Sequence, residues 1–131
     1  MTHWALKYLG QPWSQERDCW GFFREVQNDR FGLNVPAVEI DSLNLRNVID
    51  TFNTHSERTR WSEVERPVEG DAVLMGRSAN PVHVGVWLPV NGGTVLHSEQ
   101  TSGVVLQSLS SLQIHRWTHI RFYRHVSRYT A

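Results

Sequence analysis

Cys19 is the only cysteine of the chain, and it stands where a segment with helical periodicity begins. A thiol attacks a carbonyl carbon as its thiolate, and the ordinary thiol pKa of about 8.5 leaves most of it protonated at neutral pH. The free N–H groups and the dipole at a helix N-terminus favour negative charge and lower such a pKa. Cys19 is therefore a candidate nucleophile, and the alternative is a small core residue at the start of a helix.

Seven histidines could accept the thiol proton. His83 begins an apolar stretch, residues 83–88, in which strand alternation puts it on the same face as Gly85. A glycine there leaves room for the close approach of another strand. His97 lies in the next strand-like stretch. A cysteine that opens a helix, followed by a histidine and a polar residue on successive strands, is the order of papain-like sites, in which the first histidine takes the thiol proton and the third group orients it.

A contact between these two histidines depends on the turn between their strands. A three-residue loop at 91–93 would leave His83 four residues from the position opposite His97, which is too far for a hydrogen bond at about 3.3 Å per residue. We therefore expect a wider turn centred near Val90. If His97 points elsewhere, a reserve orienter would hold the His83 ring in its place, either Glu99 or Gln100.

A metal is the other chemistry that these residues could support. Cys19, His83 and His97 on separate elements could bind zinc, but the chain has no short-spaced ligand pair typical of such sites. His115 and His119 have helical spacing without a cysteine or carboxylate pair beside them. We expect neither a metal nor another cofactor.

The elements that must position these residues change type along the chain. The first half predicts a short helix over residues 3–9, a helix from Cys19 to about Phe31 between Asp18 as N-cap and Gly32 as stop, and a helix from residue 42 or 44 to about 52. After a short strand or turn at residues 61–64, the second half predicts short strands bounded by Gly, Pro and Asn, over residues 71–75, 82–88, 94–98, 103–109 and 120–126. We expect an α+β fold, with N-terminal helices packed on one side of a C-terminal antiparallel meander.

Bulk properties limit the alternatives. A chain of 131 residues with 40% hydrophobic residues predicts a single domain over residues 1–131. A single cysteine excludes an intrachain disulfide, and no apolar run approaches the roughly 20 residues of a membrane span. A formal net charge of zero argues against a nucleic-acid binder. After Glu99 the chain has arginines and no acidic residue, which indicates either a solvated strand end or a docking surface for an anionic partner.

Five stretches, taken in order, resemble the NlpC-type cell-wall cysteine peptidases, which have a compact papain-like fold. These are residues 8–13, 18–22, 69–75, 83–88 and 95–98. The resemblance implies that Cys19 is the nucleophile, His83 the general base and His97 its orienter. It also implies a peptidoglycan peptide as substrate. From the charge and the lack of a long apolar run, we expect neither nucleic acid nor a membrane as partner.

Three residues near the cysteine also match the family pattern or depart from it. The resemblance implies that the Tyr8 hydroxyl helps to stabilise the oxyanion, with ordinary packing as the alternative. It implies that Asp18 recognises a free amino group of a cell-wall peptide, with a plain helix cap as the alternative. Trp20 replaces the serine that the family usually has for substrate recognition.

The sequence Asp-Cys-Trp-Gly at 18–21 looks like the version of the family found in proteins of bacteriophage tails. With no signal peptide recognised at the N-terminus, we expect synthesis in the bacterial cytoplasm, association with a tail and other tail proteins, and delivery to the periplasm or cell wall. The expected function is thus hydrolysis of peptidoglycan stem peptides through an acyl-enzyme. The alternative is an inactive structural component of a tail tip.

Overall fold

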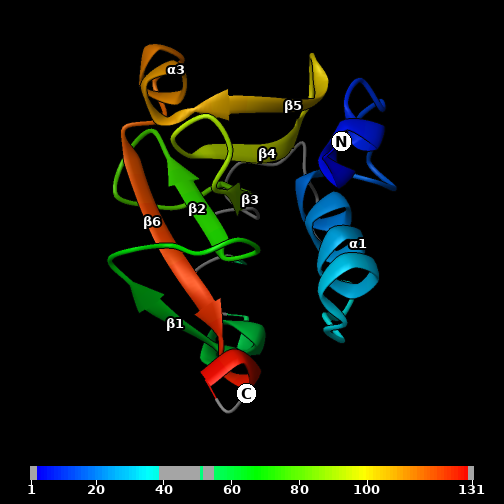
Figure 1. Ribbon diagram of the computed structural model, residues 1–131, viewed down its shortest axis with the longest axis vertical. Coiled ribbons are helices and arrows are strands. Elements are labelled where there is room, and N and C mark those ends of the chain that lie inside the picture. Colours follow the sequence, from blue (N-terminus) through cyan, green and yellow to red (C-terminus); the bar gives the residue numbers. More distant parts are fainter. Residues whose placement is uncertain (1–2, 39–50, 52–54, 130–131) are drawn as a thin grey trace.

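The computed structural model describes residues 3–38, 51 and 55–129, and it shows an α+β fold in which one long helix packs on a six-stranded antiparallel sheet (Figure 1). The elements in chain order are η1 (Trp4–Tyr8), α1 (Cys19–Phe31), η2 (Ser56–Arg60), β1 (Trp61–Val64), β2 (Ala72–Gly76), β3 (His83–Leu88), β4 (Thr94–Glu99), β5 (Gly103–Ser108), α3 (Leu109–Ile114), β6 (His119–His125) and η3 (Val126–Tyr129). Among the helices so described, none has the length and apolar character needed to cross a membrane.

The helix that begins with Cys19 has the bounds that its sequence predicts. Asp18 is the N-cap, and its Oδ1 accepts a hydrogen bond from the Gly21 N–H at 2.9 Å. Gly32 ends the helix in the left-handed conformation, with φ of 66°, which a glycine adopts without strain. The helix predicted from residue 42 or 44 to about 52 lies outside the described residues, apart from residue 51.

The strand order in the sheet is β1-β6-β2-β3-β4-β5. The predicted meander is confirmed for β2 to β5 and is wrong for the last strand, because β6 returns to pair with β2 and β1 instead of β5. The short helix α3, capped by the Ser108 hydroxyl, was not predicted, and it follows directly on β5. Figure 1 shows α3 at the end of the sheet away from α1.

The three central strands of the sheet, β2, β3 and β4, are buried on both faces. On one face, residues of α1 such as Phe22 and Val26 pack against alternate strand residues such as Val84 and Leu96. On the other face, Val73, Met75, Trp87 and Val95 pack against Leu112 of α3 and Trp117. The central strand β3 is therefore buried along its whole length, and its histidine lies in the interior.

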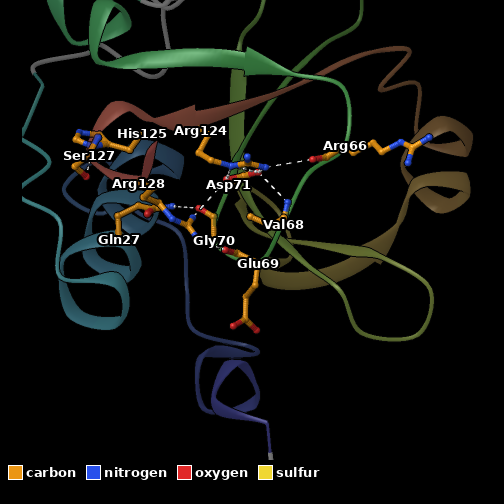
Figure 2. Close-up of polar contacts among 10 residues, drawn as sticks. All are labelled: Gln27, Arg66, Val68, Glu69, Gly70, Asp71, Arg124, His125, Ser127 and Arg128. Atoms are coloured by element: carbon orange, nitrogen blue, oxygen red, sulfur yellow. Dashed lines mark hydrogen bonds and ion pairs between the residues drawn. The ribbon is translucent and has the colours of Figure 1, made fainter. Parts of the chain in front are cut away.

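A buried carboxylate just before β2 holds the C-terminal strand in place (Figure 2). Asp71 is fully buried, and Arg124 donates to it from Nε at 3.0 Å and from Nη2 at 2.8 Å. Arg128 contacts the same carboxylate at 3.4 Å and donates to the Glu69 carbonyl at 2.8 Å. Two half-buried arginines of the basic C-terminal part are thus paired with a buried carboxylate, which favours a structural role for these two over a docking surface.

Candidate functional site

His83 and His97 are hydrogen-bonded to each other across β3 and β4. His83 Nε2 lies 2.8 Å from His97 Nδ1, and the rings meet edge to face at 81°. His83 is 7% exposed and His97 is completely buried. The contact that the sequence led us to expect between these two side chains is therefore present in the fold.

The register that produces this contact differs slightly from the expected one. Val86 faces Leu96, and the same register carried one step further places His97 opposite Gly85, so the two histidines are diagonal neighbours. Diagonal pairs on one face of a sheet lie within reach of long side chains. The turn spans residues 89–93 and centres on Asn91, so the expected centre at Val90 is wrong by one residue. Asn91 and the two glycines after it have positive φ, which sets this turn.

Gly85 makes the close approach of the two strands feasible. A Cβ at this position would lie 2.6 Å from Val95 Cγ1 and 3.0 Å from His97 Cβ. Both distances are shorter than ordinary carbon contacts, so any larger residue would push β4 away. The expected role of this glycine as a spacer is confirmed.

Cys19 is the first residue of α1 and lies against the strand that carries His83. The residue is half-buried and packs on the core between helix and sheet. The backbone of Val84, the residue after His83, lies close enough to the Cys19 thiol to lower its pKa. Within the described part of the chain, no hydrogen bond joins the thiol to either imidazole ring. The fold therefore brings Cys19 to the strand of His83 without closing a thiol–imidazole bond.

Burial sets the charge state of the cysteine. Burial, and secondarily the Asp18 carboxylate, raise the pKa of the Cys19 thiol from 9.0 to about 12. The backbone N–H groups of Val84, Trp20 and Cys19 itself act in the opposite direction and are outweighed. The expectation of a lowered pKa is therefore wrong for the resting protein, because the loss of hydration outweighs the favourable helix terminus.

The two histidines are also held neutral. Burial, then His97 and then Arg77 lower the pKa of His83 well below 6.5. Burial lowers the pKa of His97 as well, against the opposing effects of Glu99 and Gln107. Glu99, one of the two reserve orienters, has its carboxylate 3.9 Å from His97 Nδ1. At neutral pH the resting site thus holds a thiol and two uncharged imidazoles.

Two neighbours of the histidine pair carried no signal in the sequence. Trp117 stacks on the His83 ring at 5.0 Å and 13°, and Arg77 lies 3.8 Å from the centre of the same indole. Gln107 Oε1 lies 2.8 Å from His97 Nε2. Trp117 comes from the loop after α3 and Gln107 from β5, so only the folded arrangement of these segments shows that they reach the site.

The other three residues singled out from the sequence lie around the first turn of α1. Tyr8 is buried with its ring edge-on to Phe22 at 5.5 Å, and its hydroxyl makes no hydrogen bond to the described residues. Asp18 is the helix cap, as the simpler reading of it predicted. Trp20 points toward the segment after the helix, where its Nε1–H donates to the Pro36 carbonyl at 3.1 Å.

The zinc arrangement considered from the sequence is not formed. Among residues 3–38, 51 and 55–129, no group of three or more His, Cys, Asp or Glu side chains is placed to hold a metal ion. Cys19, His83 and His97 are therefore not arranged as a metal-ligand set.

Comparisons with known proteins give a family for this chain and a solved structure with a similar fold. A family model described as the NlpC/P60 family matches residues 7–122. The crystal structure of the NlpC/p60 domain of the peptidoglycan hydrolase SagA is similar with a TM-score of 0.56 and 21% sequence identity, over 91% of this chain and 90% of that one. The second match shows a common fold over nearly the whole length of both chains. Comparison with curated proteins gave no match.

Proposed function

This chain belongs to the NlpC/P60 family, and on that premise we propose that it is a cell-wall cysteine peptidase that cuts an amide bond in a peptidoglycan stem peptide. Cys19 is the nucleophile, His83 the general base and His97 the residue that orients it. The observation that carries the proposal is the buried hydrogen bond between the rings of His83 and His97. Val84, the next residue on the strand of His83, lies against the Cys19 thiol.

The resting charge state determines how the reaction begins. Since both the thiol and the imidazoles are neutral, the proton passes from Cys19 to His83 as the sulfur attacks the carbonyl carbon. His83 Nε2 is occupied by His97, so Nδ1 is the nitrogen that takes this proton. Hydrogen bonds at such sites tighten when substrate binds, which is consistent with the open thiol–imidazole contact in the free protein.

The remaining steps follow the chemistry of an acyl-enzyme. Protonated His83 gives its proton to the leaving amine as the C–N bond breaks, and the acyl group stays on Cys19 as a thioester. His83 then takes a proton from water, whose oxygen attacks the thioester and releases a carboxylate and the thiol. The Cys19 backbone N–H and the Tyr8 hydroxyl, which has no partner among the described residues, are the proposed donors to the oxyanion.

The residues around Cys19 bear on the choice of substrate. The Asp18 carboxylate lies at the start of the helix, beside the nucleophile, and we propose that it pairs with the free amino group of a stem peptide. Trp20 replaces the usual family serine and lines an apolar pocket with Val84 and Tyr123. We propose that this pocket, and not a hydroxyl, contacts the part of the peptide next to the cut bond.

We further propose that the enzyme works as part of a phage or prophage tail. Support comes from the Asp-Cys-Trp-Gly sequence at 18–21, which resembles that of tail-associated members. Mass spectrometry of tail particles purified from the producing strain should detect this chain in the particles. Its presence in the cell lysate alone would argue against delivery by a tail.

A structural role in a tail tip is the second candidate. The raised thiol pKa and the open contact between Cys19 and His83 favour it, because a decayed site needs no reactive sulfur. The two functions differ in whether the protein cleaves cell wall. The peptidase turns over substrate, whereas the structural component leaves purified cell wall unchanged.

Digestion of purified peptidoglycan tests the proposed function. The wild-type protein should release stem-peptide fragments whose masses identify the cut bond, and Cys19→Ala and His83→Gln should release none. His119→Gln, a change at an exposed histidine, is the matched control and should keep full activity. Equal release by Cys19→Ala would refute the thiol mechanism, and an inactive wild-type protein would favour the structural role.

A further inference from the structure

A chain of hydrogen bonds runs from β5 into the histidine pair. His97 Nε2 lies 2.8 Å from Gln107 Oε1, and Gln107 Nε2 donates to the Ser111 hydroxyl at 3.1 Å. Ser111 belongs to α3, which follows β5 directly. Its own backbone N–H is bound to the Ser108 hydroxyl, so this first turn of the helix is fixed by its cap.

The direction of each bond follows from the chemistry of the groups. In the structure the amide nitrogen of Gln107 donates to the Ser111 hydroxyl and the amide oxygen faces His97, and that oxygen can only accept. His97 must then carry its proton on Nε2, which leaves Nδ1 bare in the neutral ring. A bare Nδ1 accepts from His83 Nε2–H, so neutral His83 has its free lone pair on Nδ1.

We infer that Gln107 is a positioning residue that sets the tautomers of His97 and, through it, of His83, so that the base presents an unprotonated nitrogen for the thiol proton. This inference rests on the proposed function for its catalytic consequence, although the tautomers themselves do not depend on it. The alternative tautomer of His97 places a proton on Nδ1. That proton would face His83 Nε2 and force the His83 proton onto Nδ1, the nitrogen that must be free.

The position of Gln107 suits this role. It is half-buried on β5, and its neighbour across the ladder on β4 is Val95, two residues before His97. His97 itself is completely buried, so water cannot replace the amide oxygen freely if Gln107 is lost. His115 Nδ1 lies 2.8 Å from the Ser111 carbonyl, to which it must donate, and 3.4 Å from Gln107 Nε2. Because this Nδ1 carries a proton, it cannot accept from the Gln107 amide, and the Ser111 hydroxyl is the better partner.

Nitrogen NMR of the imidazole rings tests the inference without any substrate. In protein labelled with ¹⁵N-histidine, at a pH where both rings are neutral, His97 and His83 should each show the proton on Nε2. In Gln107→Met, which removes the acceptor at similar volume, His97 should lose this single tautomer. Gln113→Met, the same change at an exposed glutamine of α3, should leave both signals as they are.

Kinetics on soluble muropeptides test whether Gln107 affects catalysis. Gln107→Met should lower kcat by about 10-fold or more with KM little changed, because only proton transfer is affected. Gln107→Glu keeps an oxygen acceptor and should recover a good part of kcat. A His97 proton on Nδ1 in the wild type, or unchanged tautomers in Gln107→Met, would overturn the inference. If the wild type proves inactive on every substrate, the proposed function fails while the NMR result still decides the role of Gln107.

Discussion

His83 and His97 lie diagonally across two antiparallel strands, and their ring nitrogens are 2.8 Å apart in the interior of the protein. This one contact depends on the turn at residues 89–93, on the glycine at 85 and on the packing of both faces of the sheet. Loss of the second ring would leave the His83 N–H buried without a partner. We therefore expect the pair to be as important for stability as for activity.

His97→Ala should lower kcat by about 100-fold and destabilise the fold by about 1–3 kcal/mol, since it removes the orienter and leaves a buried donor unsatisfied. His97→Asn, which offers a side-chain oxygen, should be affected less in both respects. Activity assays and urea unfolding measure the two effects. If His97→Ala kept wild-type kcat, His97 would have no part in the reaction.

Gly85→Ala should destabilise the protein by about 1–3 kcal/mol, because the added Cβ would meet Val95 and His97 at 2.6 and 3.0 Å. Gly21→Ala is a suitable control. Its added Cβ would have only ordinary contacts, the nearest at 3.5 Å from Asp18 Oδ1, and alanine favours the helix by about 0.5–1 kcal/mol. Thermal unfolding should therefore shift in opposite directions for the two variants. An equal shift would show that the strands near Gly85 relax freely.

Asp71→Asn should cost about 2–4 kcal/mol of stability, because it removes the charge that Arg124 and Arg128 share in the interior (Figure 2). The C-terminal strand should loosen first, and hydrogen exchange of β6 would detect this. Glu63→Gln, at an exposed carboxylate on β1, should change stability by less than about 0.5 kcal/mol. Unchanged exchange in β6 would mean that the ion pairs contribute little.

Stability should fall on both sides of neutral pH. The pKa of His83 and of His97 is lower in the folded chain than 6.5, so the unfolded chain binds more protons as the pH drops through 6.5, and stability is lost there. The pKa of Cys19 is raised from 9.0 to about 12, so between these values the unfolded chain loses the thiol proton before the folded chain does. The contribution of the thiol to folding stability is therefore complete below pH 9 and is lost as the pH rises toward 12. Urea unfolding at pH 5, 7.5 and 10 would measure both effects.

The cysteine part of this pH dependence has its own control. Cys19→Ser does not titrate in this range and should lose less stability than the wild type between pH 7.5 and 10. The alkylation rate of the wild-type thiol should still be rising above pH 9. A rate that levels off near pH 7 would show a thiolate in the resting protein, against the charge state derived from burial.

The sequence predicted the parts of the molecule that depend on local signals. The helix beginning at Cys19 has a cap and a stop within its own sequence, and its bounds agree with the structure. Strand alternation likewise put His83 on the same face as Gly85, next to the strand that carries His97. The contact between them followed once a wide turn was assumed, although the centre of that turn was placed one residue too early.

The parts that depend on distant pairing could not be predicted in the same way. Nothing local in β6 says that it pairs with β2 rather than β5, because strand pairing depends on contacts between distant segments. In the structure the chain between β5 and β6 packs Leu112 and Trp117 on the second face of the sheet. Gln107 reaches His97 only through the β4–β5 register, so an ordinary polar strand residue gave no sign of its role. The thiol pKa depended on the depth of burial, which the position at a helix start does not reveal.

Trapping of the covalent intermediate tests the mechanism most directly. Wild-type protein mixed with a defined muropeptide and quenched in acid within milliseconds to seconds should carry the mass of the acyl fragment on the tryptic peptide that contains Cys19. Cys19→Ala should carry no such mass and should hydrolyse nothing. Hydrolysis by Cys19→Ala at the wild-type rate, or turnover with the acyl fragment on another residue, would contradict the assignment of Cys19 as nucleophile.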